Sequence, residues 1–111
     1  MTRHRLCAVA ELAEAQARQF ALPLAERSLD VFVVKWRGHL YAYINSCPHT
    51  GAGLNWVPHE FFDPDYQHLQ CATHGALFRP DDGVCVWGPC AGQALSPVAV
   101  EIEDGLAYAC I

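Results

Sequence analysis

The sequence lacks any long run of apolar residues, and it is poor in basic ones. No stretch approaches the roughly 20 apolar residues that a membrane-spanning helix requires, so we expect no membrane partner. Lys and Arg number 7 against 12 Asp and Glu, which gives a net charge of −5. Because phosphate binding needs a basic stripe, this balance argues against nucleic acid as a partner. The acidic excess is equally compatible with steering toward a basic partner and with simple solubility.

Targeting segments, low-complexity tracts and internal repeats are also missing. The start, Met1–Cys7, is basic, but Glu11 and Glu14 interrupt the next segment, so no apolar core of a secretory peptide forms. We therefore expect a cytoplasmic protein. A chain of 111 residues predicts a single domain over 1–111, too short to add a mononuclear-iron oxygenase domain or a flavin domain.

The sequence does contain two short segments that each combine a cysteine with a histidine. They read Cys47-Pro48-His49 and Cys71-Ala72-Thr73-His74. A structural zinc site can also use two Cys and two His, but it usually takes C-x-x-C with H-x-x-x-H on a turn and a helix. Here each segment mixes the two residue types, and neither lies in a helical pattern. Mixed ligation suits a two-iron cluster that takes cysteines on one iron and histidines on the other.

Together these segments resemble those of the Rieske-type [2Fe-2S] ferredoxins, the soluble type that serves oxygenases. That family shows C-x-H, then C-x-x-H-G, an apolar-aromatic stretch, an Asp-Gly turn, a Gly-Pro loop and a final pair of strands. The matching parts are Cys47 to His49, Cys71 to Phe78, Asp82-Gly83, Gly88-Pro89 and Val98 to Ala109. The resemblance implies one [2Fe-2S] cluster per chain, bound by four metal ligands. These are Cys47, His49, Cys71 and His74.

The charge of such a cluster supports the mixed ligand set. Two thiolates bring a core of two ferric ions and two sulfides to a formal charge of zero, whereas four would leave it doubly negative. Because adding an electron to a neutral centre is easier, histidine ligation raises the reduction potential above that of an all-cysteine cluster. Each imidazole keeps a second nitrogen that can donate to solvent or a partner. We expect the electron to leave by the histidine edge.

The expected fold class is all-β, a Rieske-like antiparallel β-sandwich or open barrel with an inserted cluster-binding subdomain over about 46–81. Two hairpins are predicted, one joining 30–36 to 39–44 through Arg37-Gly38 and one joining 98–103 to 106–109 through Asp104-Gly105. Shorter strands are expected at 68–71, 77–79 and 84–87. The one helical candidate is Val9–Gln19, where a strand followed by a loop, as in the family, is favoured over a helix.

The chain departs from the respiratory members of the family. Those carry an extra cysteine in each ligand loop, joined as a disulfide, and here the matching positions hold Ala52 and Thr73. A serine and a tyrosine that donate hydrogen bonds to respiratory clusters are matched by Ala76 and Phe78. Such bonds stabilise the reduced cluster, so their loss lowers the potential. We expect a midpoint near the bottom of the roughly −150 to +300 mV range.

Other chemistry-bearing residues are expected outside the ligand set. Cys7, Cys85, Cys90 and Cys110 are predicted to be free thiols, mostly in the core. Cys90, in the Gly-Pro loop, is predicted to lie near the cluster without binding it. His59 and His68 are expected at the surface, and Trp36 and Trp87 in strand cores.

The interval between the two segments is rich in aromatic residues, with Trp56, Phe61, Phe62 and Tyr66. Packing of the small subdomain is slightly favoured as their role. The alternative is that Trp56 or the pair Phe61-Phe62 is exposed and docks a redox partner.

The leading functional hypothesis is a one-electron carrier, not itself an enzyme, that passes electrons from a flavin reductase to an oxygenase. A second is a small redox subunit of a nitrite-reductase-like complex, whose relatives share the fold but often lack the ligands. The third is a zinc-stabilised binding module with no redox role.

Overall fold

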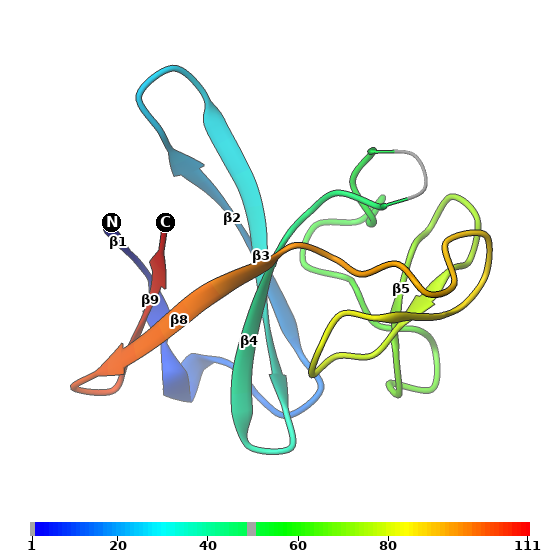
Figure 1. Ribbon diagram of the computed structural model, residues 1–111. Coiled ribbons are helices and arrows are strands. Elements are labelled where there is room, and N and C mark those ends of the chain that lie inside the picture. The colour runs from blue at the N-terminus through cyan, green and yellow to red at the C-terminus, as the bar shows by residue number, and fades with distance from the viewer. Residues whose placement is uncertain (1, 49–50) are drawn as a thin grey trace.

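A computed structural model describes residues 2–48 and 51–111, which form two antiparallel sheets (Figure 1). The larger has six strands in the order β1-β9-β8-β4-β3-β2 and curls into a nearly closed barrel. Its strands are β1 (Arg3–Ala8), β2 (Ala17–Pro23), β3 (Ser28–Trp36), β4 (His39–Ile44), β8 (Pro97–Glu103) and β9 (Leu106–Cys110). The smaller sheet contains β5 (Leu69–Gln70), β6 (Leu77–Phe78) and β7 (Cys85–Trp87) in that order. The predicted all-β class is confirmed.

Both predicted hairpins of the larger sheet are present. β3 and β4 meet at the pair Trp36 and His39, across a turn in which Arg37 and Gly38 have φ of 50° and 80°. The turn between β8 and β9 repeats this geometry, with φ of 52° at Asp104 and 75° at Gly105. Two successive positive φ angles define the hairpin turn whose twist matches that of its strands. Gly as the second turn residue is what made these turns readable from the sequence.

The region of the helical candidate holds only a 3-10 turn, η1, at Val9–Glu11. Beyond it the chain enters β2, which pairs with β3 in seven consecutive residue pairs. The expectation that Val9–Gln19 is not an α-helix is confirmed, but a turn and a loop come first and the strand follows them, the reverse of the expected order. Backbone pairing with β3 decides the conformation here, because the local preference of an Ala- and Glu-rich segment is weak.

Strand β3 separates two apolar cores. Val31, Phe32, Val33 and Val34 are all 0% exposed, and alternate members face opposite sides. Val31 and Val33 pack inside the barrel, whereas Phe32 and Val34 face the cluster of side chains that joins the barrel to the small sheet. An unbroken apolar run of this kind is typical of a strand buried on both faces. Among the described residues, no helix is long and apolar enough to cross a membrane.

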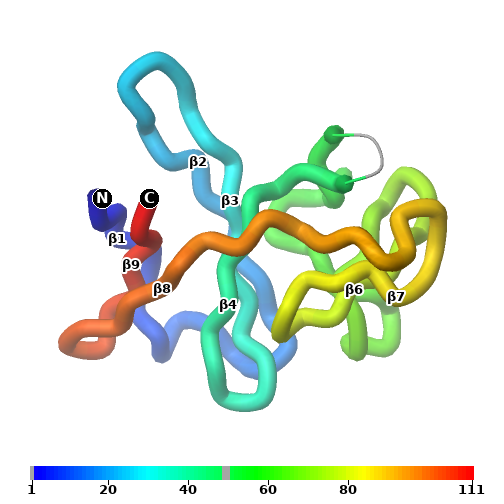
Figure 2. The backbone as a smooth tube through the Cα atoms, in the orientation of Figure 1, coloured from blue at the N-terminus to red at the C-terminus, as the bar shows by residue number. Residues whose placement is uncertain are grey.

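The connection from β4 to β8 forms a lobe beside the barrel (Figure 2). It leaves β4, contains the whole small sheet, and returns to pair with β4 again at Ala42–Val98. Both Cys-His segments belong to this lobe. The predicted subdomain over 46–81 includes β5 and β6, and β7 comes after it. A loop region anchored at both ends by one barrel strand is held firmly at its base.

Candidate metal centre

Backbone hydrogen bonds join the two sides of the first Cys-His segment. The N–H of Gly51 donates to the Cys47 carbonyl at 2.7 Å, and the N–H of Cys47 donates to the Ala52 carbonyl at 2.7 Å. Gly51 has a φ of 78°, a conformation that glycine adopts without strain. These bonds fix the backbone of Cys47. His49 lies outside the described residues.

The second segment repeats this geometry. Gly75 donates to the Cys71 carbonyl at 2.8 Å and has a φ of 72°, while Cys71 donates to the Ala76 carbonyl at 2.9 Å. The sequence carries the signal for this repeat, since both loops read Cys-x-x-x-Gly-Ala. The prediction used only the Cys-His pairs and did not include this repeated pattern. The shared pattern places each cysteine at the entrance of the same type of turn.

The two loops are joined to each other and to the barrel. The N–H of Ala72 donates to the Leu54 carbonyl at 2.7 Å, and the N–H of Leu54 donates to the side-chain oxygen of Asn45 at 2.8 Å. The side-chain nitrogen of Asn45 donates to Asp30 at 3.0 Å and to Asn55 at 2.9 Å. Asn45 directly follows β4, so this network ties the ligand loops to the barrel. Bonds of this kind hold metal ligands in place.

Burial differs sharply between the cysteines and the histidine. Cys47 and Cys71 are each 1% exposed, whereas His74 is exposed. Both thiols thus lie inside the lobe while the imidazole of the second segment is at its surface. Among residues 2–48 and 51–111, no three His, Cys, Asp or Glu side chains are already gathered as a site for a metal ion. Buried sulfur donors beside a surface imidazole match a cluster with cysteines on its inner iron and histidines on its outer one.

Cys90 contacts the first ligand segment, as expected from its place in the Gly-Pro loop. Burial raises the pKa of its thiol to about 12, and hydrogen bonds with Cys85 and Cys47 add to the rise. Cys90 thus lies beside Cys47, and its predicted place near the cluster, without being a ligand, stays a prediction. Among the remaining cysteines, Cys7 and Cys85 are buried, and Cys110 is partly exposed; all are free thiols.

The prediction for one of the two tryptophans is wrong. Trp36 is 8% exposed and belongs to the core, but Trp87 is 61% exposed. β7 has three residues and pairs only with β6, so it is an edge strand with an open face. Trp87 instead lies against the second ligand loop, where a β-carbon added at Gly75 would be 3.8 Å from its ring.

The aromatic residues between the ligand segments divide into two groups. Phe61 is 1% exposed and stacks on Phe32 of β3, with ring centroids 4.0 Å apart. Phe62 is half-buried, 6.0 Å from the ring of Trp36. Trp56 and Tyr66 are exposed. Packing is therefore the role of the phenylalanines, and docking by the pair Phe61-Phe62 is contradicted.

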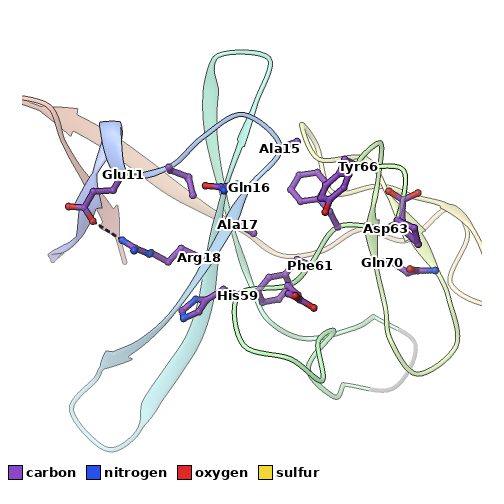
Figure 3. A pocket seen from close by; sticks show the side chains of 14 residues that line it. Glu11, Ala15, Gln16, Ala17, Arg18, His59, Phe61, Asp63, Tyr66 and Gln70 are labelled. Carbon is purple, nitrogen blue, oxygen red and sulfur yellow. Dashed lines mark hydrogen bonds and ion pairs between the residues drawn. The ribbon is translucent and has the colours of Figure 1, made fainter.

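A cavity of about 630 Å³ lies between β2 and the segment that carries these aromatic rings (Figure 3). Arg18 and Glu11 form an ion pair of 2.7 Å on one side of it, and Tyr66 lies on the other. His59 also lines it, and its Nδ1 accepts the N–H of Gln19 at 2.9 Å. None of Cys47, Cys71 and His74 lines this cavity, so it is separate from the candidate metal centre.

Several solved structures with the same fold come from carbazole 1,9a-dioxygenase systems. The ferredoxin of carbazole 1,9a-dioxygenase from Nocardioides aromaticivorans IC177 is 20% identical, with a TM-score of 0.72 over 99% of this chain and 98% of that one. A chain in the complex of reduced oxygenase and oxidized ferredoxin of carbazole 1,9a-dioxygenase is 20% identical, with a TM-score of 0.75. The match covers 97% of this chain and 92% of that one.

The terminal oxygenase of carbazole 1,9a-dioxygenase from Novosphingobium sp. KA1 is 22% identical, with a TM-score of 0.74. The match covers 98% of this chain but 29% of that one, so this chain spans less than a third of the oxygenase. At these identities the similarity establishes the fold. A search of curated protein sequences finds no match.

The sequence profile of the Rieske [2Fe-2S] domain matches residues 2–102. This range contains both Cys-His segments, the whole small sheet, and the larger sheet except for β9 and the last residue of β8. The buried thiols and the surface imidazole are donors of the kind that such a cluster uses. The chain belongs to the family of Rieske [2Fe-2S] domains, which bind a [2Fe-2S] cluster.

Proposed function

We propose that this protein is a cytoplasmic electron carrier that takes one electron from a flavin reductase and delivers it to an oxygenase. The observation that carries the proposal is the contrast between Cys47 and Cys71, each 1% exposed, and His74 at the surface. With sulfur ligands inside and imidazole outside, the cluster has one edge close to solvent. The absence of a disulfide among the six cysteines, all of them within the described residues, is in keeping with a reducing compartment.

Four residues would hold the cluster in this proposal, Cys47 and Cys71 on the inner iron and His49 and His74 on the outer one. The cluster supplies reversible one-electron transfer when it is bound. The chain's own contribution is to bury Cys47 and Cys71 and to hold their backbones with hydrogen bonds. His74 offers its second ring nitrogen to solvent or to a partner's surface. No substrate is transformed at this site.

The surface beside His74 is suited to a protein partner. Trp87 is 61% exposed and lies against the same loop, next to Gly75. Exposed aromatic residues are common anchors of protein interfaces. An oxygenase as acceptor is supported by the fold shared with ferredoxins and oxygenases of carbazole dioxygenase systems. The flavin reductase as donor follows from the family resemblance.

The first test combines metal analysis with electron paramagnetic resonance of the dithionite-reduced protein. We expect iron without zinc, and the signal of a histidine-ligated [2Fe-2S] cluster. The variants Cys47→Ser and Cys71→Ser should lose the visible absorption of the cluster, whereas Cys110→Ser should keep it. Zinc without a paramagnetic signal would instead establish a binding module.

The second test measures delivery of the electron. Protein reduced by a purified flavin reductase and NADH is mixed rapidly with a Rieske oxygenase, and its reoxidation is followed by absorption. Trp87→Ala should slow reoxidation while leaving the cluster spectrum unchanged. Ile102→Ala is the matched control, since Ile102 is 57% exposed and belongs to β8 of the barrel rather than to the lobe. Equal rates for both variants would remove Trp87 from the docking surface.

A further inference from the structure

Two cysteines outside the ligand set face each other beside the metal centre. Cys85 is the first residue of β7, and Cys90 lies in the loop after that strand. The Cys90 thiol donates a hydrogen bond to the Cys85 sulfur, with 3.1 Å between the two sulfur atoms. Each residue is 2% exposed. The two thiols therefore share one buried site.

The backbone around this pair is fixed by its own hydrogen bonds. Cys85 donates to the Gln93 carbonyl at 2.7 Å, and its carbonyl accepts the N–H of Gly92 at 3.0 Å. Gln93 in turn donates to the Cys90 carbonyl at 2.9 Å. With both backbones held, the sulfurs need to approach by about 1 Å, through side-chain rotation, to reach the roughly 2.0 Å of a disulfide bond.

The loop between the two cysteines covers the ligand loops. A β-carbon added at Gly88 would come within 2.8 Å of the Ala76 backbone, and Trp87 lies against Gly75. Cys90 itself interacts with Cys47. A bond between residues 85 and 90 would therefore fasten the segment that touches both cysteine loops.

We propose that Cys85 and Cys90 are a modification site, a dithiol that a peroxide oxidises to a reversible disulfide in the cluster-loaded protein. This site is separate from the four cluster ligands, and it does not depend on which protein receives the electron. Because both thiols are buried and the pKa of the Cys90 thiol is raised, we expect this oxidation to be slow compared with that of an exposed thiolate. The bond would close a short ring that contains Trp87 and Gly88.

The chemistry balances with hydrogen peroxide as the oxidant. One sulfur attacks a peroxide oxygen, the O–O bond breaks, and a sulfenic acid and one water form. The second sulfur attacks the sulfenic sulfur, the S–S bond forms, the S–O bond breaks and a second water leaves. The two thiols lose two electrons and two protons, which the peroxide takes up. A small thiol such as glutathione reverses the change by two exchange steps, itself becoming a disulfide.

The experiment uses the cluster-loaded full chain with its thiols reduced. Hydrogen peroxide is added in small excess while the visible absorption of the cluster is followed. Remaining thiols are blocked with iodoacetamide in denaturant, and the chain is digested with chymotrypsin. Cleavage after Phe78, Trp87 and Tyr108 places Cys85, Cys90 and Cys110 in different peptides. Mass spectrometry then reads which peptides are joined.

We expect peptide 79–87 to be joined to 88–108, with the loss of two hydrogens, cluster absorption retained, and separation on reduction. Cys110→Ser should keep this link and Cys85→Ser should lose it. Three results would overturn the proposal: both cysteines fully alkylated, Cys90 joined to Cys47, or bleaching of the cluster before any link forms. If Cys85→Ser does not fold, the peptide map of the oxidised wild-type protein tests the proposal by itself. Cys7 and Cys110, which should stay unlinked, are its internal controls.

Discussion

Gly88 lies so close to Ala76 that a β-carbon added at Gly88 would come within 2.8 Å of the Ala76 Cα. Gly88 also has a φ of 110°, so a side chain there is strained as well as crowded. We predict that Gly88→Ala lowers the free energy of unfolding by about 1–3 kcal/mol through overpacking, beyond the backbone strain. Because Ala76 closes the turn of Cys71, the variant should also lose its cluster more readily. Denaturant unfolding and chelator-induced bleaching measure the two effects.

Gly92→Ala is the matched control for that variant. Gly92 has a φ of 92°, but a β-carbon there meets no atom within 4 Å. The variant Gly92→Ala therefore carries backbone strain of about 1–2 kcal/mol without the steric clash. Equal destabilisation by the two variants would contradict close packing of the Gly88 loop on the second ligand loop.

The stack of Phe61 on Phe32 is predicted to hold the segment between the ligand loops onto β3. Phe61 is 1% exposed, so Phe61→Ala removes a whole buried ring and should cost about 3–5 kcal/mol of unfolding free energy. Trp56→Ala, in the same segment but 76% exposed, should change stability by about 0.5 kcal/mol or less. Denaturant midpoints of the two variants at constant cluster content provide the comparison. A similar small effect for both would contradict the role of the Phe61 ring in holding this segment onto β3.

The features that could be predicted from the sequence depend on short-range interactions. The two hairpins depend on a local turn whose second residue, Gly38 or Gly105, has a positive φ that glycine favours. The Cys-His segments could be found because metal ligation demands particular residue types at short spacing. The residues that make up each of these features lie within a few positions of one another in the chain.

Contacts between distant segments could not be predicted in this way. Strand content alone does not show that β7 is an edge, so the exposure of Trp87 was missed. The bond from Ala72 to Leu54 joins residues on separate loops, and no composition or spacing encodes it. The approach of Cys90 to Cys85 depends on the geometry of the loop after β7. The Cys-x-x-x-Gly-Ala pattern, by contrast, occurs twice in the sequence and could have predicted the repeated turn, although the prediction did not use it.

The reduction potential is predicted to respond to a hydroxyl added at Ala76. Ala76 and Phe78 are both 0% exposed and carry no hydroxyl, so they offer the cluster no side-chain donor. A hydrogen bond to a charged group contributes about 1.5–3 kcal/mol, which for one electron corresponds to roughly 60–130 mV. Ala76→Ser should raise the midpoint by up to this amount, since a donor favours the more negative reduced state.

Protein-film voltammetry on the wild type and on Ala76→Ser measures this shift. The wild-type midpoint is expected near the bottom of the roughly −150 to +300 mV range. Ala99→Ser, at an exposed position of β8, is the control and should leave the midpoint unchanged. A wild-type value above about +100 mV would contradict the expected lack of donors around the cluster.

Tyr43 is predicted to make stability depend on pH in the alkaline range. Its hydroxyl donates to the Pro80 carbonyl at 2.8 Å in the core, and burial, with Asp82 and Asp81 nearby, raises its pKa above the usual 10.0. Above about pH 10 the unfolded chain loses this proton while the folded protein keeps it, so the unfolded state binds fewer protons and stability falls as pH rises. Below that pH the contribution is fully present.

Replacing Tyr43 with phenylalanine separates the hydrogen bond from the titration. Tyr43→Phe leaves the buried Pro80 carbonyl without this donor and should cost about 1–3 kcal/mol at neutral pH. The same variant cannot lose a phenolic proton, so its free energy of unfolding should fall less steeply than that of the wild type above about pH 10. Tyr108→Phe, a partly exposed position on β9, controls for loss of a phenol elsewhere. Parallel pH curves for wild type and Tyr43→Phe would show that another group causes the alkaline loss of stability.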